Sequence, residues 1–214
     1  MNSGYVDRLS RTDREVILTL VPEGVRVLDL GCGDCSLLND LVTHRRIRGT
    51  GVDIDGRQLV NGLAYGVNVY QGDLDEGLSD FPDHAYDYVI LNQTLQVVKH
   101  PLQVLKEMLR IGRFGIVGFP NFAQWQLRFG HFFRGRAPKS PALPFEWYDT
   151  PNIRVLSILD FLDYCRQEKI HVVKQRHLLG GRWLRTGRLP HLNNLLAHIG
   201  LFVITRKVGV MNLQ

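Results

Sequence analysis

The chain has 214 residues, which is enough for one globular domain of ordinary to large size, and its 44% hydrophobic and 22% charged residues are typical of a soluble globular protein. No apolar run approaches the length of about 18 residues that a transmembrane helix needs, and the first 25 residues lack the apolar segment of a signal peptide. We therefore expect a cytoplasmic protein with no membrane contact, and the odd number of three cysteines argues against a secreted disulfide scaffold.

The formal net charge of +5 is unevenly distributed along the chain. Residues 1–120 hold 12 Lys or Arg against 16 Asp or Glu, whereas residues 121–214 hold 14 against 5 and five of the eight histidines. The basic half is either a solvated face or a docking surface for a partner protein, an anionic metabolite or nucleic acid. Nucleic acid is the least favoured of these, because the arginines form no tight run with interleaved aromatic residues.

Apolar strands alternate with helical patterns through the first 120 residues. Hydrophobic periodicity predicts strands at 25–29, 49–53, 67–71, 86–91 and 113–119, and helices at 35–43, 58–63 and 101–109. This alternation is typical of a doubly wound, mostly parallel α/β sheet that helices cover on both faces.

The second half of the chain is less regular. Residues 121–151 are rich in aromatic residues, Arg, Pro and Gly, and are long for a connection, so we expect a functional or interacting insertion. Ser157 and Asp160 predict a capped start for a helix at 157–167. Two last strands, predicted at 170–174 and 201–206, flank a second insertion at 179–200 and bring the expected sheet to seven strands. With no repeat or boundary, the sequence predicts one domain over 1–214, with its core at about 12–120 and 152–206.

The stretch VLDLGCGDC at 27–35 holds two overlapping motifs. One is a glycine-rich turn between a strand and a helix, in which Gly31 and Gly33 allow a ligand to approach the backbone. Asp53, 20 residues after Gly33 at the end of the second strand, has the spacing of a carboxylate that binds ribose hydroxyls. The other motif is the C-x-x-C pair of a redox dithiol or half a metal site. A zinc site would need two further ligands and Cys165 stands alone, and between the two cysteines Gly33 and Asp34 match the ligand loop.

The turn does not match two common nucleotide fingerprints. Position 36 is serine where the G-x-G-x-x-G dinucleotide fingerprint has its third glycine, and the Gly-Lys-Ser/Thr of a phosphate-binding P-loop is absent. Asp29, two residues before the first glycine, is unfavourable beside a pyrophosphate but suits a cationic ligand. S-adenosylmethionine (SAM) carries both an ammonium and a sulfonium group.

These segments resemble the motifs of class I SAM-dependent methyltransferases. VLDLGCGDC is similar to their first motif, D/E-x-G-x-G-x-G, and GVDID at 51–55, QGDLDE at 71–76 and YDYVILNQTLQVV at 86–98 resemble the motifs of the second, third and fourth strands. The resemblance implies that Asp53 holds the ribose and that Asp73 accepts a hydrogen bond from the adenine amino group. Taken singly, Asp29 also fits a cap and Asp73 a turn residue. The residues implied to bind SAM, or its demethylated product S-adenosylhomocysteine (SAH), are Asp29, Gly31, Cys32, Gly33, Asp53, Ile54, Asp73, Leu74 and Asn92.

Later segments resemble the MetW family of methionine biosynthesis proteins. They are FPNFAQWQLRFGHFFRGRAPKS at 119–140, LPFEWYDTPNIR at 143–154 and LDFLDYC at 159–165, and with the SAM motifs the resemblance covers about 12–206. The family implies an accessory role beside homoserine O-acyltransferase (MetX), which makes the acyl-homoserine precursor of methionine. Aromatic and basic residues of the insertion would then dock the acyltransferase; the alternative is a lid or core packing under the long loop. These residues are Trp125, Arg128, Phe132, Phe133, Arg136, Trp147 and Tyr148.

Cys35 departs from the family pattern, which normally has the third glycine of the loop there. Because cysteine is small and the start of a helix usually has negative φ, we expect Cys35 to adopt negative φ and the loop still to bind its ligand. A position near a helix N-terminus also predicts a lowered pKa for the Cys35 thiol.

The sequence leaves the chemistry open. Asn92 is followed by Gln93, Thr94 and Leu95 instead of the prolines and aromatic residue of an N/D-P-P-Y/F/W motif, which argues against adenine or cytosine methylation. An O- or C-methyltransferase needs a general base, but His100 and His131 fit surface positions better. The candidates are a SAM-binding accessory subunit, a free-standing methyltransferase for a small metabolite and, least favoured, a nucleic-acid-modifying enzyme.

Overall fold

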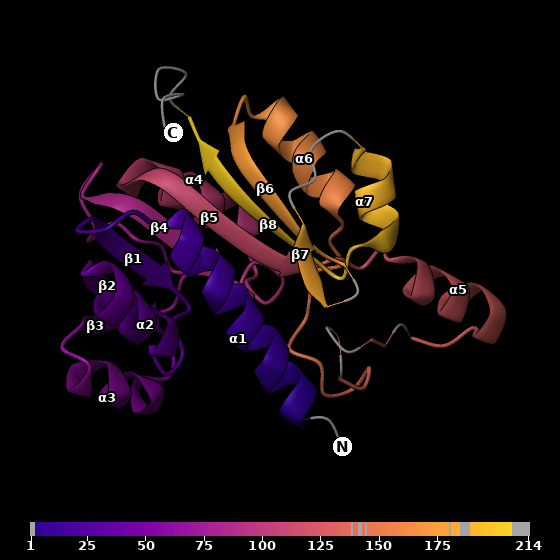
Figure 1. Cartoon of the computed structure of the whole chain (residues 1–214), viewed down its shortest axis with the longest axis horizontal. Helices are drawn as coiled ribbons and strands as arrows, with labels where there is room; N and C mark the ends of the chain where they lie inside the picture. The colour runs from indigo at the N-terminus through magenta and orange to yellow at the C-terminus, as the bar shows by residue number, and fades with distance from the viewer. Residues whose placement is uncertain are drawn as a thin grey trace.

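The computed structural model describes residues 3–137, 139–140, 143, 145–179, 181–184 and 189–206, with the side chains of 3–11 excepted. The described residues form one eight-stranded sheet in the order β3-β2-β1-β4-β5-β8-β6-β7 (Figure 1). Its strands are β1 (Arg26–Leu30), β2 (Arg48–Asp53), β3 (Asn68–Gln71), β4 (Tyr86–Asn92), β5 (Gly112–Pro120), β6 (His171–Leu179), β7 (Arg182–Leu184) and β8 (Ile199–Thr205). β1 to β5 pair in parallel, whereas β8 pairs antiparallel with β5 and β6, and β7 with β6.

Helices cover both faces of this sheet. They are α1 (Ser3–Leu20), α2 (Ser36–Arg45), α3 (Gly56–Ala64), α4 (Pro101–Ile111), α5 (Trp125–Arg134), α6 (Ile158–Gln167) and α7 (Pro190–Leu196). Apolar residues of α1, α2 and α3 form one core with Val27 and Ile90, and those of α4 and α6 form the other with Leu28 and Val89. Neighbouring strand residues thus face opposite cores, which explains the uninterrupted apolar runs.

The order of the strands places a binding site at the carboxyl ends of β1 and β4. β1 pairs with β2 on one side and with β4 on the other, so the chain order reverses between β1 and β4. In open parallel sheets, ligands bind in the crevice outside the carboxyl ends of the strands at such a switch point.

The predicted doubly wound α/β fold is confirmed, but the sheet has eight strands rather than seven. The additional strand, β7, lies in the predicted second insertion and pairs with the last residues of β6. β6 continues to Leu179, whereas the pattern predicted an end near residue 174, because the intervening Lys174, Gln175 and Arg176 are polar and half-buried. Polar residues on a half-buried strand near the sheet edge weaken the apolar signal on which the prediction relied.

α1 was not predicted. Ile17 and Leu20 of α1, together with Val21 just after the helix, pack into the core beside α2. Residues 3–15 of the helix are mostly polar, so the sequence shows no sustained apolar periodicity there. None of the helices among the described residues is long and apolar enough to cross a membrane.

The predicted capping box at the start of α6 is confirmed. The Ser157 hydroxyl accepts a 3.2 Å hydrogen bond from the backbone N–H of Asp160, whose carboxylate accepts a 3.0 Å bond from the N–H of Ser157. In contrast, α5 in the first insertion buries only Leu127 and extends away from the sheet (Figure 1).

Candidate functional site

A cavity of about 420 Å³ opens at the carboxyl ends of the first four strands. This volume lies within the usual range for small-molecule sites. Five of the predicted binding residues line it: Gly31, Asp53, Ile54, Asp73 and Leu74. The other four, Asp29, Cys32, Gly33 and Asn92, lie in the same strand ends and loops but outside the lining.

The backbone of the loop after β1 turns back onto β2. The N–H groups of Gly31 and Cys32 both donate to the carbonyl of Val52, at 2.8 and 3.1 Å. Gly31 has φ +77°, and a Cβ there would come within 2.5 Å of the Thr94 hydroxyl. Only glycine therefore allows the loops after β1 and β4 to approach each other this closely.

Asp53 holds two backbone segments at once. Its Oδ2 accepts a 2.7 Å hydrogen bond from the N–H of Gly33, and its Oδ1 accepts a 2.9 Å bond from the N–H of Asp55. Each carboxylate oxygen can accept more than one hydrogen bond, so the side chain retains capacity for a ligand hydroxyl.

The acidic loop after β3 is fixed in a similar way. Asp73 accepts a bond from the N–H of Asp75 through Oδ1, at 2.9 Å. Asp75 accepts bonds from the N–H groups of Lys99 and His100, at 2.9 and 2.7 Å, which connect this loop to the segment after β4. Partial burial favours a higher pKa for Asp75, but these two donors outweigh it and lower the pKa.

Asp29 is a buried carboxyl group behind the glycine loop, with 3% of its surface exposed. Burial, together with the neighbouring negative charge of Asp53, raises its pKa to about 7. A cation in the cavity would favour the charged form of Asp29, so this carboxyl group suits a positively charged ligand.

The expectation of negative φ at Cys35 is wrong. Cys35 is the N-cap of α2, not its first helical residue, and it has φ +60° and ψ 17°. Its N–H donates to the Cys32 carbonyl at 2.9 Å, so the chain makes a tight left-handed turn there. This conformation costs a non-glycine residue about 1–2 kcal/mol, which is the physical reason for glycine at this position in the family pattern.

The expected lowering of the Cys35 pKa is also wrong, because burial raises the pKa of the Cys35 and Cys32 thiols. The two sulfur atoms lie 3.3 Å apart as free thiols. A Cβ at Gly51 would lie 2.6 Å from the Cys32 sulfur, and one at Gly62 would lie 2.8 Å from the Cys35 sulfur. The thiols thus fill space that two glycines leave beside the loop.

Asp13 and Gln93 are site residues that the sequence analysis missed. Asp13 lies on α1, is 1% exposed, and accepts a 3.0 Å hydrogen bond from the Gln93 amide, which lines the cavity. Burial raises the pKa of Asp13 to about 7, against the smaller lowering by Gln93 and Asn92. Gln93 has φ +57°, and strain of this kind clusters at functional sites. The one signal in the sequence was a carboxyl residue one helical turn before the apolar Ile17.

Two further groups near the cavity are acceptors without donors. The side-chain oxygens of Asn92 and Gln96 are buried, and neither has a hydrogen-bond partner among the described residues. Buried acceptors of this kind call for a donor. Neither side chain lines the cavity itself, but each is next in sequence to a lining residue, Gln93 or Val97. His100 and His131 are exposed, as expected.

The sequence matches the model of the family described as methionine biosynthesis protein MetW over residues 11–204. A curated relative, the bifunctional methionine biosynthesis protein MetXA/MetW of Rhodopirellula baltica, is 42% identical over 164 residues. The match covers 72% of this chain but 26% of the relative, so the chain spans about a quarter of that protein's length.

Solved structures of low sequence identity share the fold. A SAM-dependent methyltransferase from Thermotoga maritima is 19% identical with a TM-score of 0.68, covering 94% of this chain and 91% of that one. One from Mesorhizobium loti has a TM-score of 0.63 at 13% identity, covering 89% and 95%. The [4+2]-cyclase SpnF also has a TM-score of 0.63, at 15% identity and 92% and 82% coverage, so the fold alone does not specify methyl transfer. The chain therefore belongs to the MetW family of methionine biosynthesis proteins and has the fold of class I SAM-dependent methyltransferases.

Proposed function

We propose that this chain is a SAM- or SAH-binding accessory subunit that acts with homoserine O-acyltransferase in methionine biosynthesis. The observation that carries the proposal is the relative whose name joins MetXA and MetW in one polypeptide. Covalent linkage keeps two modules at high effective concentration, which is useful when they act on the same step. In this proposal the chain associates with the acyltransferase in the cytoplasm.

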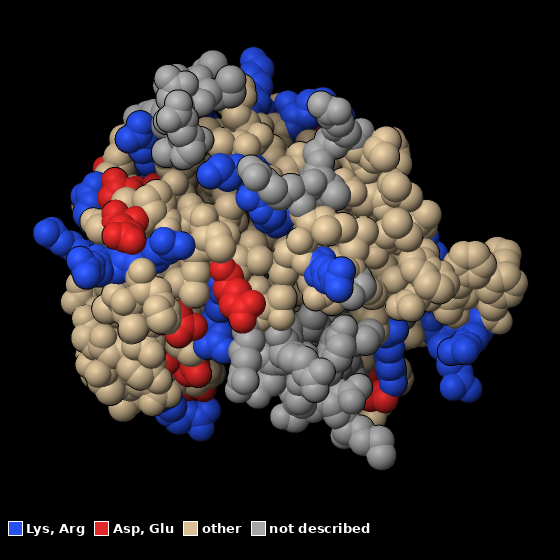
Figure 2. Space-filling model, viewed as in Figure 1, with Lys and Arg blue, Asp and Glu red and all other residues tan. Residues whose placement is uncertain are grey.

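The exposed aromatic residues of α5 support a docking surface. Trp125, Phe129 and Phe133 follow one another at four-residue intervals, with ring centroids 6.1 and 5.5 Å apart. Phe132 packs edge-on against Phe133 and is 81% exposed. Figure 2 shows that α5 protrudes from the body with mainly uncharged surface on the face seen and Lys and Arg below it. Contiguous exposed apolar surface of this kind marks interaction sites.

Further aromatic rings and two arginines of the insertion are also exposed and suit a protein interface. Trp147 and Tyr148 are 75% and 70% exposed, and Arg128 and Arg136 are also exposed. Arginines and exposed aromatic rings are the side chains enriched at protein interfaces. A partner surface with apolar pockets and acidic groups would complement them, and nucleic acid is not required.

The cavity would hold SAM or SAH through the strand-end carboxylates. Asp53 would bind the ribose, and Asp73 would accept a hydrogen bond from the adenine amino group. At the amino-acid end of the ligand, Asn92 would accept a hydrogen bond and Asp29 would pair with the positive charge. The buried unpaired acceptors support a cationic ligand there. When bound, SAM supplies a methyl group attached to a sulfonium. An occupied cavity regulates the acyltransferase only if the ligand binds the two states of the complex with different affinity.

A second candidate is a methyltransferase for a small metabolite, and Asp13 is the observation that favours it. A buried carboxyl with a pKa of about 7 suits a general base near neutral pH. In that case Asp13→Asn would lower SAM turnover by about 10²-fold or more and leave partner binding unchanged. Turnover unchanged by the substitution would count against Asp13 as the base.

The docking proposal is tested by mixing the purified chain with the homoserine O-acyltransferase of the same organism. We expect the two to co-elute in size-exclusion chromatography and the rate of acyl-homoserine formation to change. Phe132→Ser with Phe133→Ser should abolish both effects. Leu63→Ser, which alters another exposed apolar residue, 65% exposed and on α3, is the control and should leave both intact. No co-elution and no change in rate with the unmodified chain would overturn the proposal.

The role of the ligand is tested by adding SAM or SAH to the complex of the chain with the acyltransferase. We expect either compound to change the acyl transfer rate, and Asp53→Ala to remove this response while co-elution persists. A rate that does not respond to saturating SAM or SAH would leave an accessory subunit without the proposed regulatory ligand.

A further inference from the structure

A second cavity, of about 320 Å³, lies at the opposite end of the same strands. Arg26, Arg48, Asn68 and Tyr86 line it, and each is the first residue of its strand, from β1 to β4. It shares no lining residue with the cavity at the carboxyl ends. The two cavities are therefore separate, at opposite ends of the first four strands.

The cavity exists because one connection lacks a helix. Residues 72–85, between β3 and β4, contain three turn-forming residues, Gly72, Gly77 and Pro82, and form turns instead of a helix. Thr50 and Tyr70 alternate with residues that face α2 and α3, so they lie on the opposite face of the sheet. This part of that face is open to a ligand, whereas doubly wound sheets are usually covered on both faces.

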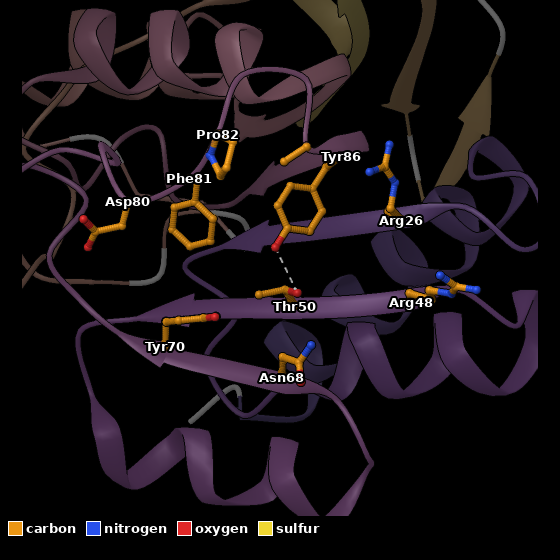
Figure 3. A pocket seen from close by; sticks show the side chains of 10 residues that line it. Arg26, Arg48, Thr50, Asn68, Tyr70, Asp80, Phe81, Pro82 and Tyr86 are labelled. Carbon is orange, nitrogen blue, oxygen red and sulfur yellow. Dashed lines mark hydrogen bonds between the residues drawn. The ribbon is translucent and has the colours of Figure 1, made fainter.

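Two guanidinium groups gather at one end of the cavity (Figure 3). Arg26 and Arg48 are register partners on neighbouring parallel strands, so their side chains lie on the same face. Nε of Arg26 donates to Asp87 at 3.4 Å. The Arg48 guanidinium has no hydrogen bond or ion pair with any described residue. This end therefore has an excess of positive charge and unused donors suited to a phosphate.

Aromatic rings line the middle of the cavity (Figure 3). Tyr70 is 55% exposed, and its ring centroid lies 5.5 Å from that of Phe81. The Phe81 and Tyr86 ring centroids are 6.2 Å apart. The Tyr86 hydroxyl donates a 3.1 Å hydrogen bond to the buried Thr50 hydroxyl, which fixes the ring. The exposed Tyr70 ring, held against Phe81, is a stacking surface for a flat group.

Asp80 lines the end of the cavity away from the arginines (Figure 3). Its carboxylate can accept hydrogen bonds from the N–H groups of a heterocyclic base. The cavity thus presents phosphate-binding donors, a stacking surface and an acceptor in sequence. We propose that it is a second ligand site, which binds a nucleoside monophosphate with its phosphate on Arg26 and Arg48 and its base against Tyr70.

Uridine 5′-monophosphate is the probe of choice, because its base differs from the adenine expected in the carboxyl-end cavity. Isothermal titration of the full chain should give saturable binding. Uridine and inorganic phosphate should each bind about tenfold or more weakly, since each lacks half of the contacts. Binding equal to that of phosphate alone would mean that no base is recognised and would overturn the proposal.

The variants separate this site from other sources of binding. Arg48→Gln and Tyr70→Ala, both at exposed positions, should each weaken binding about tenfold. Arg46→Gln removes the same charge two residues away and outside the cavity, and Asp53→Ala disables the other cavity; both should bind as the unmodified chain does. Loss of binding in either control, or no binding of the probe up to about 10 mM, would overturn the proposal.

Discussion

The backbone N–H of Gly33 donates a 2.7 Å hydrogen bond to Oδ2 of Asp53. The carboxylate expected to hold the ribose of the ligand therefore also holds the glycine loop against the end of β2. Loop order and ligand binding should depend on the same side chain.

Asp53→Ala tests this dependence. We expect the free energy of unfolding to fall by about 1–2 kcal/mol, because two backbone donors lose their acceptor, and SAH affinity to fall about tenfold or more. Urea denaturation and calorimetric titration with SAH measure the two effects. Glu15→Gln, at an exposed position on α1, should change neither quantity. SAH affinity within about twofold of the unmodified chain would contradict the role of Asp53.

The effect of a substitution at Cys35 on the free energy of unfolding should depend more on the backbone conformation that the new residue tolerates than on its size. At φ +60°, Cys35→Val should lower the free energy of unfolding by about 2–3 kcal/mol, because a β-branched residue tolerates this region poorly. Cys35→Gly relieves the strain but loses a buried thiol, so we expect a change within about 1 kcal/mol. Urea denaturation of both variants checks the order. A valine variant as stable as the glycine variant would rule out the left-handed turn.

These two residues show how far the sequence predicts the site. Asp53 was predicted because its distance from Gly33 is set by one strand–helix–strand unit, and such local spacing is visible in the sequence. The φ of Cys35 was not, because one residue decides whether it caps α2 or begins it. Asp13 was missed because only the packing of α1 against the sheet brings it to Gln93, 80 residues away.

The strands of the fold also differ in how well the sequence predicts them. β1, β2, β4 and β5 were predicted to within one residue, because strands buried on both faces are continuously apolar. β7 and the second part of β6 pair through residues that are largely polar or half-exposed, so their register depends on the neighbouring strand. The uncovered face beneath residues 72–85 follows from turn residues that the sequence contains, but only the sheet shows which side chains it exposes.

Alkylation measures the burial of the thiols. Cys32, Cys35 and Cys165 are buried, and burial raises the pKa of each, so little thiolate is available in the folded chain. We expect iodoacetamide at pH 8 to label the native chain about 10²-fold or more slowly than free cysteine, and all three positions to react in urea. Mass spectrometry identifies the labelled residues. Fast native labelling of Cys35 would show a reactive thiol instead of a packed one.

The buried carboxyl groups should make stability depend on pH. Asp13 and Asp29 have pKa values near 7 when folded and ordinary values near 4 when unfolded, so the folded chain holds more protons between these limits. The free energy of unfolding should therefore fall as pH rises from about 4 to about 7 and then level off. Asp29→Asn removes one ionisation, so the variant should match the unmodified chain near pH 4 and exceed its stability by about 2–4 kcal/mol at pH 8. Asp80→Asn, an exposed control, should show no such gain. The two are compared by urea denaturation. Equal stability of Asp29→Asn and the unmodified chain at pH 8 would mean that ionisation of Asp29 does not destabilise the folded chain, so that no bound cation is needed to stabilise the charge.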